Sequence, residues 1–342
     1  MTPRAAPLRR GSRRRANGAA LLSAMLTVAL VATFAAAALW QQWRSIEVET
    51  AERARVQAAW VLVGGLDWAR LVLREDGRTG GQDHLGEPWA VPLQEARLSS
   101  FLAADRNAGA DTSGEVLDAF LSGQIVDLQS LMNVSNLIDD SGKISSDDLH
   151  GFARLFETLG LPQAQLDTLA ENLRLAADAS AASKASPLAP LLPQRVEQLA
   201  WLGLSENTIS VLKPYITILP YRTPVNLNTA SAEVIYATVL QLSMADAQRL
   251  VAARERSPFR GIEEARLAVG AEASAFAAGQ VNVSVGSRFF EIRSRLRLDK
   301  LVTEEHAVVL RDGLDVRVLQ RWRTAPTPVT DEHQTGAPPV GR

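Results

Sequence analysis

The feature that most constrains this chain is a run of 28 residues without charge, from Ala16 to Trp43. Within it, the segment 19–39 is apolar apart from one serine and two threonines. At about 1.5 Å per residue, a helix of this length crosses the ~30 Å hydrocarbon core of a bilayer. Trp40 and Trp43 then lie where interfacial aromatic residues are expected. The sequence therefore predicts a single membrane-spanning helix.

The basic residues before this segment predict its orientation in the membrane. Six of the 36 Lys and Arg residues precede it, namely Arg4, Arg9, Arg10, Arg13, Arg14 and Arg15. The formal net charge of the chain is −2, and without these six it is −8. By the positive-inside rule the N-terminus is cytoplasmic. We therefore expect a single-pass membrane protein whose acidic body lies on the far side of the membrane from the N-terminus.

The residues that carry catalysis are scarce. The chain has no Cys and four His, so disulfides, Cys-ligated metals and a Cys nucleophile are excluded. His150 follows Asp147 and Asp148, but this pattern is typical of the polar side of a helix. Neither a nucleophile elbow nor a Gly-rich phosphate loop is present. We expect no enzymatic activity and no required cofactor.

Two interpretations of the N-terminus compete. A cleaved secretion signal would place its cleavage site near Ala36–Ala38. However, apolar residues continue at helical spacing from Trp40 to Leu73, and the first glycine after the apolar segment is Gly64. A single helix over 19–73 would be about 80 Å long. A cleaved signal has no reason to be in phase with the helix that follows it.

The continuous helix resembles that of a type IV prepilin. In that family a membrane peptidase cuts after a glycine that ends a basic leader, which here implies cleavage between Gly18 and Ala19. Most pilins carry a Glu at the fifth mature position, where this chain has Ser23. A carboxylate in lipid is costly unless it is paired, and a subunit with no neighbour above it gains no pairing. The resemblance therefore implies a tip subunit.

The rest of the chain is mostly helical and then becomes strand-like. Residues 146–175 and 193–212 have helical periodicity, and 180–190 is typical of a linker. Asn228 or Thr229 is expected to cap a helix that begins near Ala230. Alternation predicts antiparallel strands over 288–298, 301–310 and 316–322, with a hairpin at Asp312-Gly313. The Pro- and Thr-rich residues 324–342 are expected to be disordered.

Several short motifs occur in a characteristic order along the chain. They supply the residues Trp89, Asp127, Asn133, Asn136, Asn226, Asn228 and Thr229. In this order, and after a long helix, they resemble the minor pseudopilin K family of type II secretion. The resemblance reaches from the helix to about Arg323 and gives these seven residues structural roles. Several family members also lack the carboxylate that Ser23 replaces.

The resemblance implies an α+β fold, in which a pilin-like long N-terminal helix packs on an antiparallel sheet. We expect a leader over 1–18, the pilin helix over 19–73 and the first part of the α/β domain over 74–106. A large all-helical insertion follows over 107–279, with SAM-like or helix-hairpin-helix-like subdomains at about 107–180 and 190–279. Strands over 280–323 complete the domain before the tail at 324–342.

A membrane-anchored DNA-binding protein of the competence type is the main alternative. The segment around Asn226 and Thr229 also resembles helix-hairpin-helix modules, whose Gly-x-Gly turn brings backbone N–H groups to phosphate. Here the corresponding turn at 240–244 lacks glycine, and residues 222–266 carry six Arg against five acidic residues. Phosphate binding normally needs a clear basic face, so we expect no nucleic acid partner.

A calcium site is a further possibility, because Asp139, Asp140, Asp147 and Asp148 cluster in a polar loop. The spacing does not fit an EF-hand, since Leu137 stands where an acid is needed. A solvated loop whose second acidic pair begins a helix is the simpler interpretation. The family resemblance brings calcium into consideration without placing its ligands.

Together these observations predict a minor pseudopilin at the tip of the periplasmic pseudopilus, where it nucleates assembly. The partners implied are the minor pseudopilins I, J and H, the prepilin peptidase and the inner-membrane secretion platform. Exoprotein or the secretin could also contact the wide insertion. The sequence does not choose between these two.

Overall fold

The computed structural model describes residues 16–98, 119–181, 190–270, 276, 282–298, 301–324 and 327–328. The chain forms two compact units, Met1–Trp60 and Val61–Arg342. The first helix, α1 (Ala16–Thr79), contributes to both units. It begins three residues before the predicted segment and ends six residues after it.

The part of α1 in the first unit has an unusual surface. Its apolar side chains are exposed, with Leu22 70% and Phe34 67% accessible. The helix is long and apolar enough to cross a membrane. Gly18 and Ala19 both lie within it, and the Ser23 hydroxyl donates to the carbonyl of Ala20 at 2.9 Å. Such a surface suits a lipid environment or the contact with other helices, so α1 fits the predicted single-pass anchor.

The remainder of α1, in the second unit, buries one face. Leu62, Leu66, Ala69 and Leu73 recur at helical spacing and are almost fully buried. Three of them share a hydrophobic cluster with side chains of the sheet, including Phe290. The predicted packing of a long helix on a sheet is therefore confirmed.

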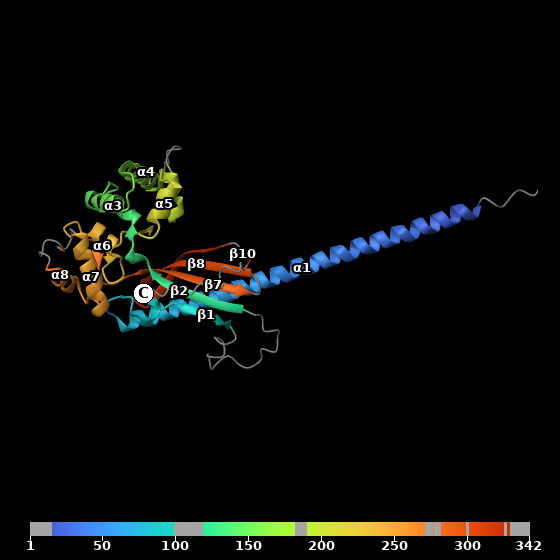
Figure 1. Cartoon of the computed structure of the whole chain (residues 1–342), viewed down its shortest axis with the longest axis horizontal. Helices are drawn as coiled ribbons and strands as arrows, with labels where there is room; N and C mark the ends of the chain where they lie inside the picture. Colours follow the sequence, from blue (N-terminus) through green and yellow to red (C-terminus); the bar gives the residue numbers. More distant parts are fainter. Residues whose placement is uncertain are drawn as a thin grey trace, which may run out of the picture. The chain divides into compact units, whose positions relative to one another are not determined.

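Within the described residues the sheet has six strands in the order β1-β2-β7-β8, and both β9 and β10 pair with β8. Figure 1 labels all of these strands except β9. Their bounds are β1 Leu93–Arg97, β2 Ala119–Asp127, β7 Phe289–Leu298, β8 Leu301–Asp312, β9 Asp315–Arg323 and β10 Thr327–Pro328. All described pairings in this sheet are antiparallel, which confirms the α+β class. Gly313, in the predicted hairpin turn, has a φ of +60°, which a side chain would disfavour.

The insertion lies between two neighbouring strands. β2 and β7 pair without a break from Ala119↔Leu298 to Asp127↔Phe290, so the chain leaves the sheet after Asp127 and re-enters at Phe289. The predicted bounds of 107 and 279 are therefore wrong, since 119–127 belongs to the sheet and 282–288 to the insertion. Residues 99–118 lie outside the described part.

The insertion contains helices and two short parallel strand pairs, so its description as all-helical needs correction. The helices are α3 Ser146–Thr158, α4 Gln163–Ala181, α5 Glu206–Leu212, α6 Ala232–Thr238, α7 Met244–Arg256 and α8 Ile262–Val269. The short 3₁₀ segments are η1 Pro88–Ala90, before the insertion, and η2 Leu128–Ser130, η3 Val134–Leu137 and η4 Val196–Leu202 within it. β3 Met132–Asn133 pairs with β4 Ile216–Thr217, and β5 Val225–Asn226 pairs with β6 Val283–Ser284.

One hydrophobic cluster holds the insertion together. It extends from Met132 to Val283 and includes buried side chains on both sides of the linker predicted at 180–190. The two predicted subdomains therefore share a core. Residues 182–189 of that linker lie outside the described residues.

Two local predictions need correction. The cap of α6 is Ser231, whose hydroxyl accepts from the N–H of Val234, rather than Asn228 or Thr229. Their side chains make other bonds, given below. Thr327 and Pro328 pair with β8, so two residues of the segment predicted as disordered form a strand. Residues 325–326 and 329–342 of that segment lie outside the described part.

Candidate functional site

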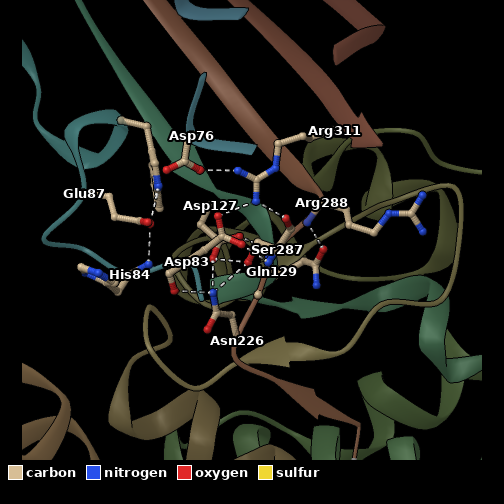
Figure 2. A network of polar contacts seen from close by, with 12 residues as sticks. Asp76, Asp83, His84, Glu87, Asp127, Gln129, Asn226, Ser287, Arg288 and Arg311 are labelled. Carbon is tan, nitrogen blue, oxygen red and sulfur yellow. Dashed lines mark hydrogen bonds and ion pairs between the residues drawn. The ribbon is translucent and has the colours of Figure 1, made fainter. Parts of the chain in front are cut away.

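The strongest concentration of buried polar groups lies where the insertion joins the sheet (Figure 2). It draws on the end of α1, the loop after it, the end of β2, the 3₁₀ segment η2, the end of β5 and the loop after it, the residues before β7 and the end of β8. We call it the polar junction and define it by its members. These are Asp76, Asp83, Glu87, Asp127, Gln129, Asn226, Thr229, Ser287 and Arg311.

Asp127 is the centre of the polar junction. One carboxylate oxygen accepts from the N–H of Gln129 at 2.8 Å, and the other from the hydroxyls of Thr229 and Ser287, both at 2.6 Å. The side chain is fully buried, and this burial raises its pKa to about 6. Hydrogen bonds to the carboxylate oppose this shift.

Asn226 connects Asp127 to the loop after α1. Its amide nitrogen lies 2.9 Å from the Ser287 hydroxyl, 3.1 Å from the Asp83 carbonyl and 3.2 Å from the Asp127 carboxylate. Its amide oxygen accepts from the N–H of Asn228 at 2.9 Å. The side chain is completely buried. Three of the sequence-predicted residues, Asp127, Asn226 and Thr229, therefore meet here.

Arg311, from the end of β8, ties the junction to α1. Its guanidinium forms ion pairs with Asp76 and Asp83 and donates to the Ser287 carbonyl at 2.8 Å. Burial raises the pKa of both carboxyls, and for Asp76 the nearby Glu87 carboxylate raises it further. Arg311 lowers both values, which opposes that effect.

Trp89 lies at the edge of the same region. Its indole N–H donates to the Glu87 carboxylate at 2.8 Å, and its ring meets Phe290 edge to face with centroids 5.2 Å apart. Glu87 also accepts from the N–H of His84 at 2.9 Å. This arrangement gives the predicted residue Trp89 both an apolar contact with the sheet and a polar contact with the loop.

The remaining predicted asparagines bond to backbone elsewhere in the insertion. Asn133 donates to the Tyr221 carbonyl at 2.8 Å and accepts from the N–H of Leu219 at 3.0 Å. Asn136 donates to the Thr223 carbonyl and accepts from its N–H. Asn228 donates to the Phe259 carbonyl and accepts from the Phe259 N–H, both at 2.9 Å. Each fastens two segments that are far apart in sequence.

The sequence did not predict the other six residues of the polar junction as site residues, namely Asp76, Asp83, Glu87, Gln129, Ser287 and Arg311. Asp83 and Arg311 are separated by 228 positions, and no local pattern marks their pairing. Arg254 was also missed. It is buried in the insertion and donates to the carbonyls of Leu227 and Ala230.

Among the described residues, one acidic group has carboxylates close enough to hold a metal ion, and it consists of Asp76, Asp83 and Glu87. Arg311 already neutralises two of these carboxylates. In the loop considered for calcium, Asp139 accepts from the N–H groups of Ser141 and Lys143, and Asp148 pairs with Arg222 at 2.7 Å.

These features define a class. A membrane-length helix that continues onto an antiparallel sheet is the pilin-like architecture, and the insertion between β2 and β7 distinguishes this member. A family model described as type II secretion system protein K matches residues 225–286, and a second model of the same description matches residues 130–221. The models divide the insertion at 221–225 rather than at 180–190.

Two curated relatives carry the same description. The chain is 30% identical over 308 residues to type II secretion system protein K of Pseudomonas aeruginosa, covering 84% of this chain and 86% of the relative. It is 23% identical over 335 residues to the Pectobacterium carotovorum protein, covering 90% and 97%. The chain belongs to the type II secretion system protein K family, whose members are minor pseudopilins.

A solved structure supports the fold. The crystal structure of the GspK–GspI–GspJ complex from the type 2 secretion system of enterotoxigenic Escherichia coli contains a similar chain, with a TM-score of 0.58 and 15% identity. The match covers 80% of this chain and 98% of that one. The comparisons indicate protein secretion, and none of these matches favours the DNA-binding alternative.

Proposed function

We propose that this minor pseudopilin forms part of the tip of the periplasmic pseudopilus and nucleates its assembly with the minor pseudopilins I, J and H. The observation that carries the proposal is the insertion of residues 128–288 between two paired strands. It adds a helical body with its own core to the pilin-like sheet. A subunit of this width leaves little room for another subunit to stack above it.

Ser23 supports the same position. A pilin subunit within a filament uses a Glu at this position to pair with the N-terminal amine of its neighbour. In this chain the Ser23 hydroxyl instead donates a hydrogen bond to the Ala20 carbonyl of its own helix. The chain thus avoids an unpaired carboxylate in the membrane. The Escherichia coli relative was crystallised in a complex with GspI and GspJ, and we extend that partnership to this chain.

Maturation and orientation complete the proposal. The prepilin peptidase removes residues 1–18 by cutting between Gly18 and Ala19. The arginines of that leader hold the N-terminus in the cytoplasm, and the body lies in the periplasm. The inner-membrane platform contacts the anchored helix, and the insertion offers a surface to exoprotein or to the secretin.

The tip position is tested by locating the protein on overproduced pseudopili. Immunogold labelling of an epitope on the insertion should mark one end of each filament, and filament number should fall when the gene is deleted. Labelling at intervals along the filament would overturn the tip position. Purification of the anchored chain without I and J, when all are co-expressed, would overturn the partnership.

A further inference from the structure

A cleft of about 340 Å³ lies inside the insertion, away from the polar junction. α3 contributes Asp147, Asp148 and Phe152 to its lining, and the end of α6 and the segment after it contribute Thr238 and Leu240. These residues come from the two halves that the family models separate. Clefts between such halves are common positions for ligands, and this volume lies in the range of ligand pockets.

The one basic side chain that lines the cleft is already engaged. Arg222 donates to the carbonyls of Asn136 and Ile138, at 2.5 and 2.9 Å, and pairs with Asp148. These bonds use three of the five N–H groups of its guanidinium. An anionic ligand would find few free donors here, and it would be repelled by the two carboxylates of α3.

Two carboxylates of the cleft can still accept hydrogen bonds from a ligand. Asp147 is exposed and has no ion pair among the described residues, and Asp148 uses one oxygen for both Arg222 and Ser145. Thr238 lines the same cleft, and its buried hydroxyl has no hydrogen-bond partner in the part of the chain described. Two carboxylates against one guanidinium leave the cleft with a net negative charge.

The floor of the cleft is apolar. Met132 and Phe152 are almost fully buried, and both line it. Gly151 lets α3 approach α6, because a side chain there would meet the Ala237 carbonyl at 3.0 Å and the Met132 methyl at 3.4 Å. A bound group therefore needs donors and positive charge at one end and an aliphatic stem at the other, as lysine and arginine have.

We propose that this cleft binds a lysine or arginine side chain of a partner polypeptide. Its ammonium or guanidinium group lies between Asp147 and the free oxygen of Asp148, and its stem covers Met132 and Phe152. A divalent cation is a poorer fit, because the cleft offers two carboxylates, one of them paired with Arg222. The site does not depend on where the protein lies in the pseudopilus.

The test uses the full chain in detergent micelles with ¹³C-labelled methionine methyl groups. Met132 reports from the cleft, whereas Met244, at the start of α7, serves as an internal control. The probe is Nα-acetyl-arginine methylamide, and Nα-acetyl-citrulline methylamide is its uncharged counterpart of nearly the same shape. We expect the arginine probe to shift the Met132 signal in a saturable manner and the citrulline probe to leave it unchanged.

Matched variants separate the site from general charge. Asp147→Asn should weaken binding of the arginine probe by about threefold or more, the range for a partly exposed ion pair. Asp140→Asn removes the same charge from an exposed position of the preceding loop and should have no effect.

Three results would overturn the proposal. They are an unchanged Met132 signal at saturating probe, equal shifts with the citrulline probe, and equal effects of Asp147→Asn and Asp140→Asn. Displacement of the arginine probe by Ca²⁺ at low concentration would also contradict it, because the cleft would then be a metal site.

Discussion

The insertion core and the polar junction are stabilised in different ways. The core is a continuous cluster of Leu, Ile, Val, Phe and Ala side chains, with Leu155 and Phe156 completely buried. The junction buries carboxylates and two amides, which bond to partners from distant segments. Apolar packing tolerates changes that preserve volume, whereas a buried polar network depends on each partner being present.

The difference indicates that the core and the junction have separate structural roles. The core gives the insertion its own stability, since apolar burial is the dominant favourable term in folding. The junction contributes little net stability, because desolvation of its carboxylates offsets much of the gain from their bonds. We infer that it fixes the orientation of the insertion on the sheet.

The largest expected effect is in the core. Phe156→Ala removes a fully buried ring and should lower the free energy of unfolding of the insertion by about 3–5 kcal/mol. Hydrogen exchange measured by mass spectrometry should show faster exchange in α3–α7 and little change in β7 and β8. Equal acceleration in the sheet would show that the two regions do not differ as described.

Asn226→Ala should have the next largest effect, about 2–3 kcal/mol, because it removes one of the buried donors to the Asp127 carboxylate and the side-chain donor to the Asp83 carbonyl. In contrast to the core variant, it should accelerate exchange on both sides of the junction, in the loop after α1 and in α6. Asn207→Ala, at an exposed position of α5, is the control and should be close to neutral. Exchange confined to the insertion would contradict the role of the junction.

The junction should also make stability depend on pH. Burial raises the pKa of Asp127 to about 6, above its ordinary value of 3.8, so the folded state holds this proton more tightly than the unfolded state. This contribution to stability is present at low pH and is lost as the pH rises from about 4 through about 6. Asp127→Asn removes it, since an amide does not titrate.

We therefore compare the wild type with Asp127→Asn by urea denaturation at pH 4 and pH 7. The variant should gain on the order of 2 kcal/mol relative to the wild type between these values. A difference between the two proteins that stays constant with pH would show that Asp127 titrates normally.

The smallest expected effect is on the surface of the insertion. Lys213 pairs with Glu197 at 2.7 Å, and both side chains are largely exposed. Lys213→Ala should change the free energy of unfolding by no more than about 0.5 kcal/mol, and less at high salt. A larger loss of unfolding free energy in the same urea experiment would contradict the comparison. It would show that surface charges contribute substantially to the stability of the insertion.

Much of the fold could be predicted because local patterns carry it. Helical spacing predicted α1 to within a few residues, and alternation predicted β7, β8 and β9 with the turn at Gly313. Asp127, Asn226 and Thr229 were also found from the sequence, through motifs that resemble a family. The spacing of these residues alone does not place them together.

The rest depends on contacts between distant residues. In the sequence, Arg311 is one of several basic residues in segments of strand-like alternation, and nothing near it indicates a partner. Its ion pairs with Asp76 and Asp83 form only in the tertiary structure. The cap of α6 was misplaced because several polar residues in a row could serve, and tertiary bonds engage Asn228 and Thr229 first. The start of the insertion was placed too early because β2 was not distinguished from it.

The central claim is that this chain is processed and assembled as a pseudopilin, and the N-terminus of the mature protein tests it most directly. Mass spectrometry of the protein from the inner membrane should give Ala19 as the first residue, and Gly18→Ala should leave the precursor uncut. A mature chain that begins just after Ala36–Ala38, with processing unaffected by Gly18→Ala, would contradict the account.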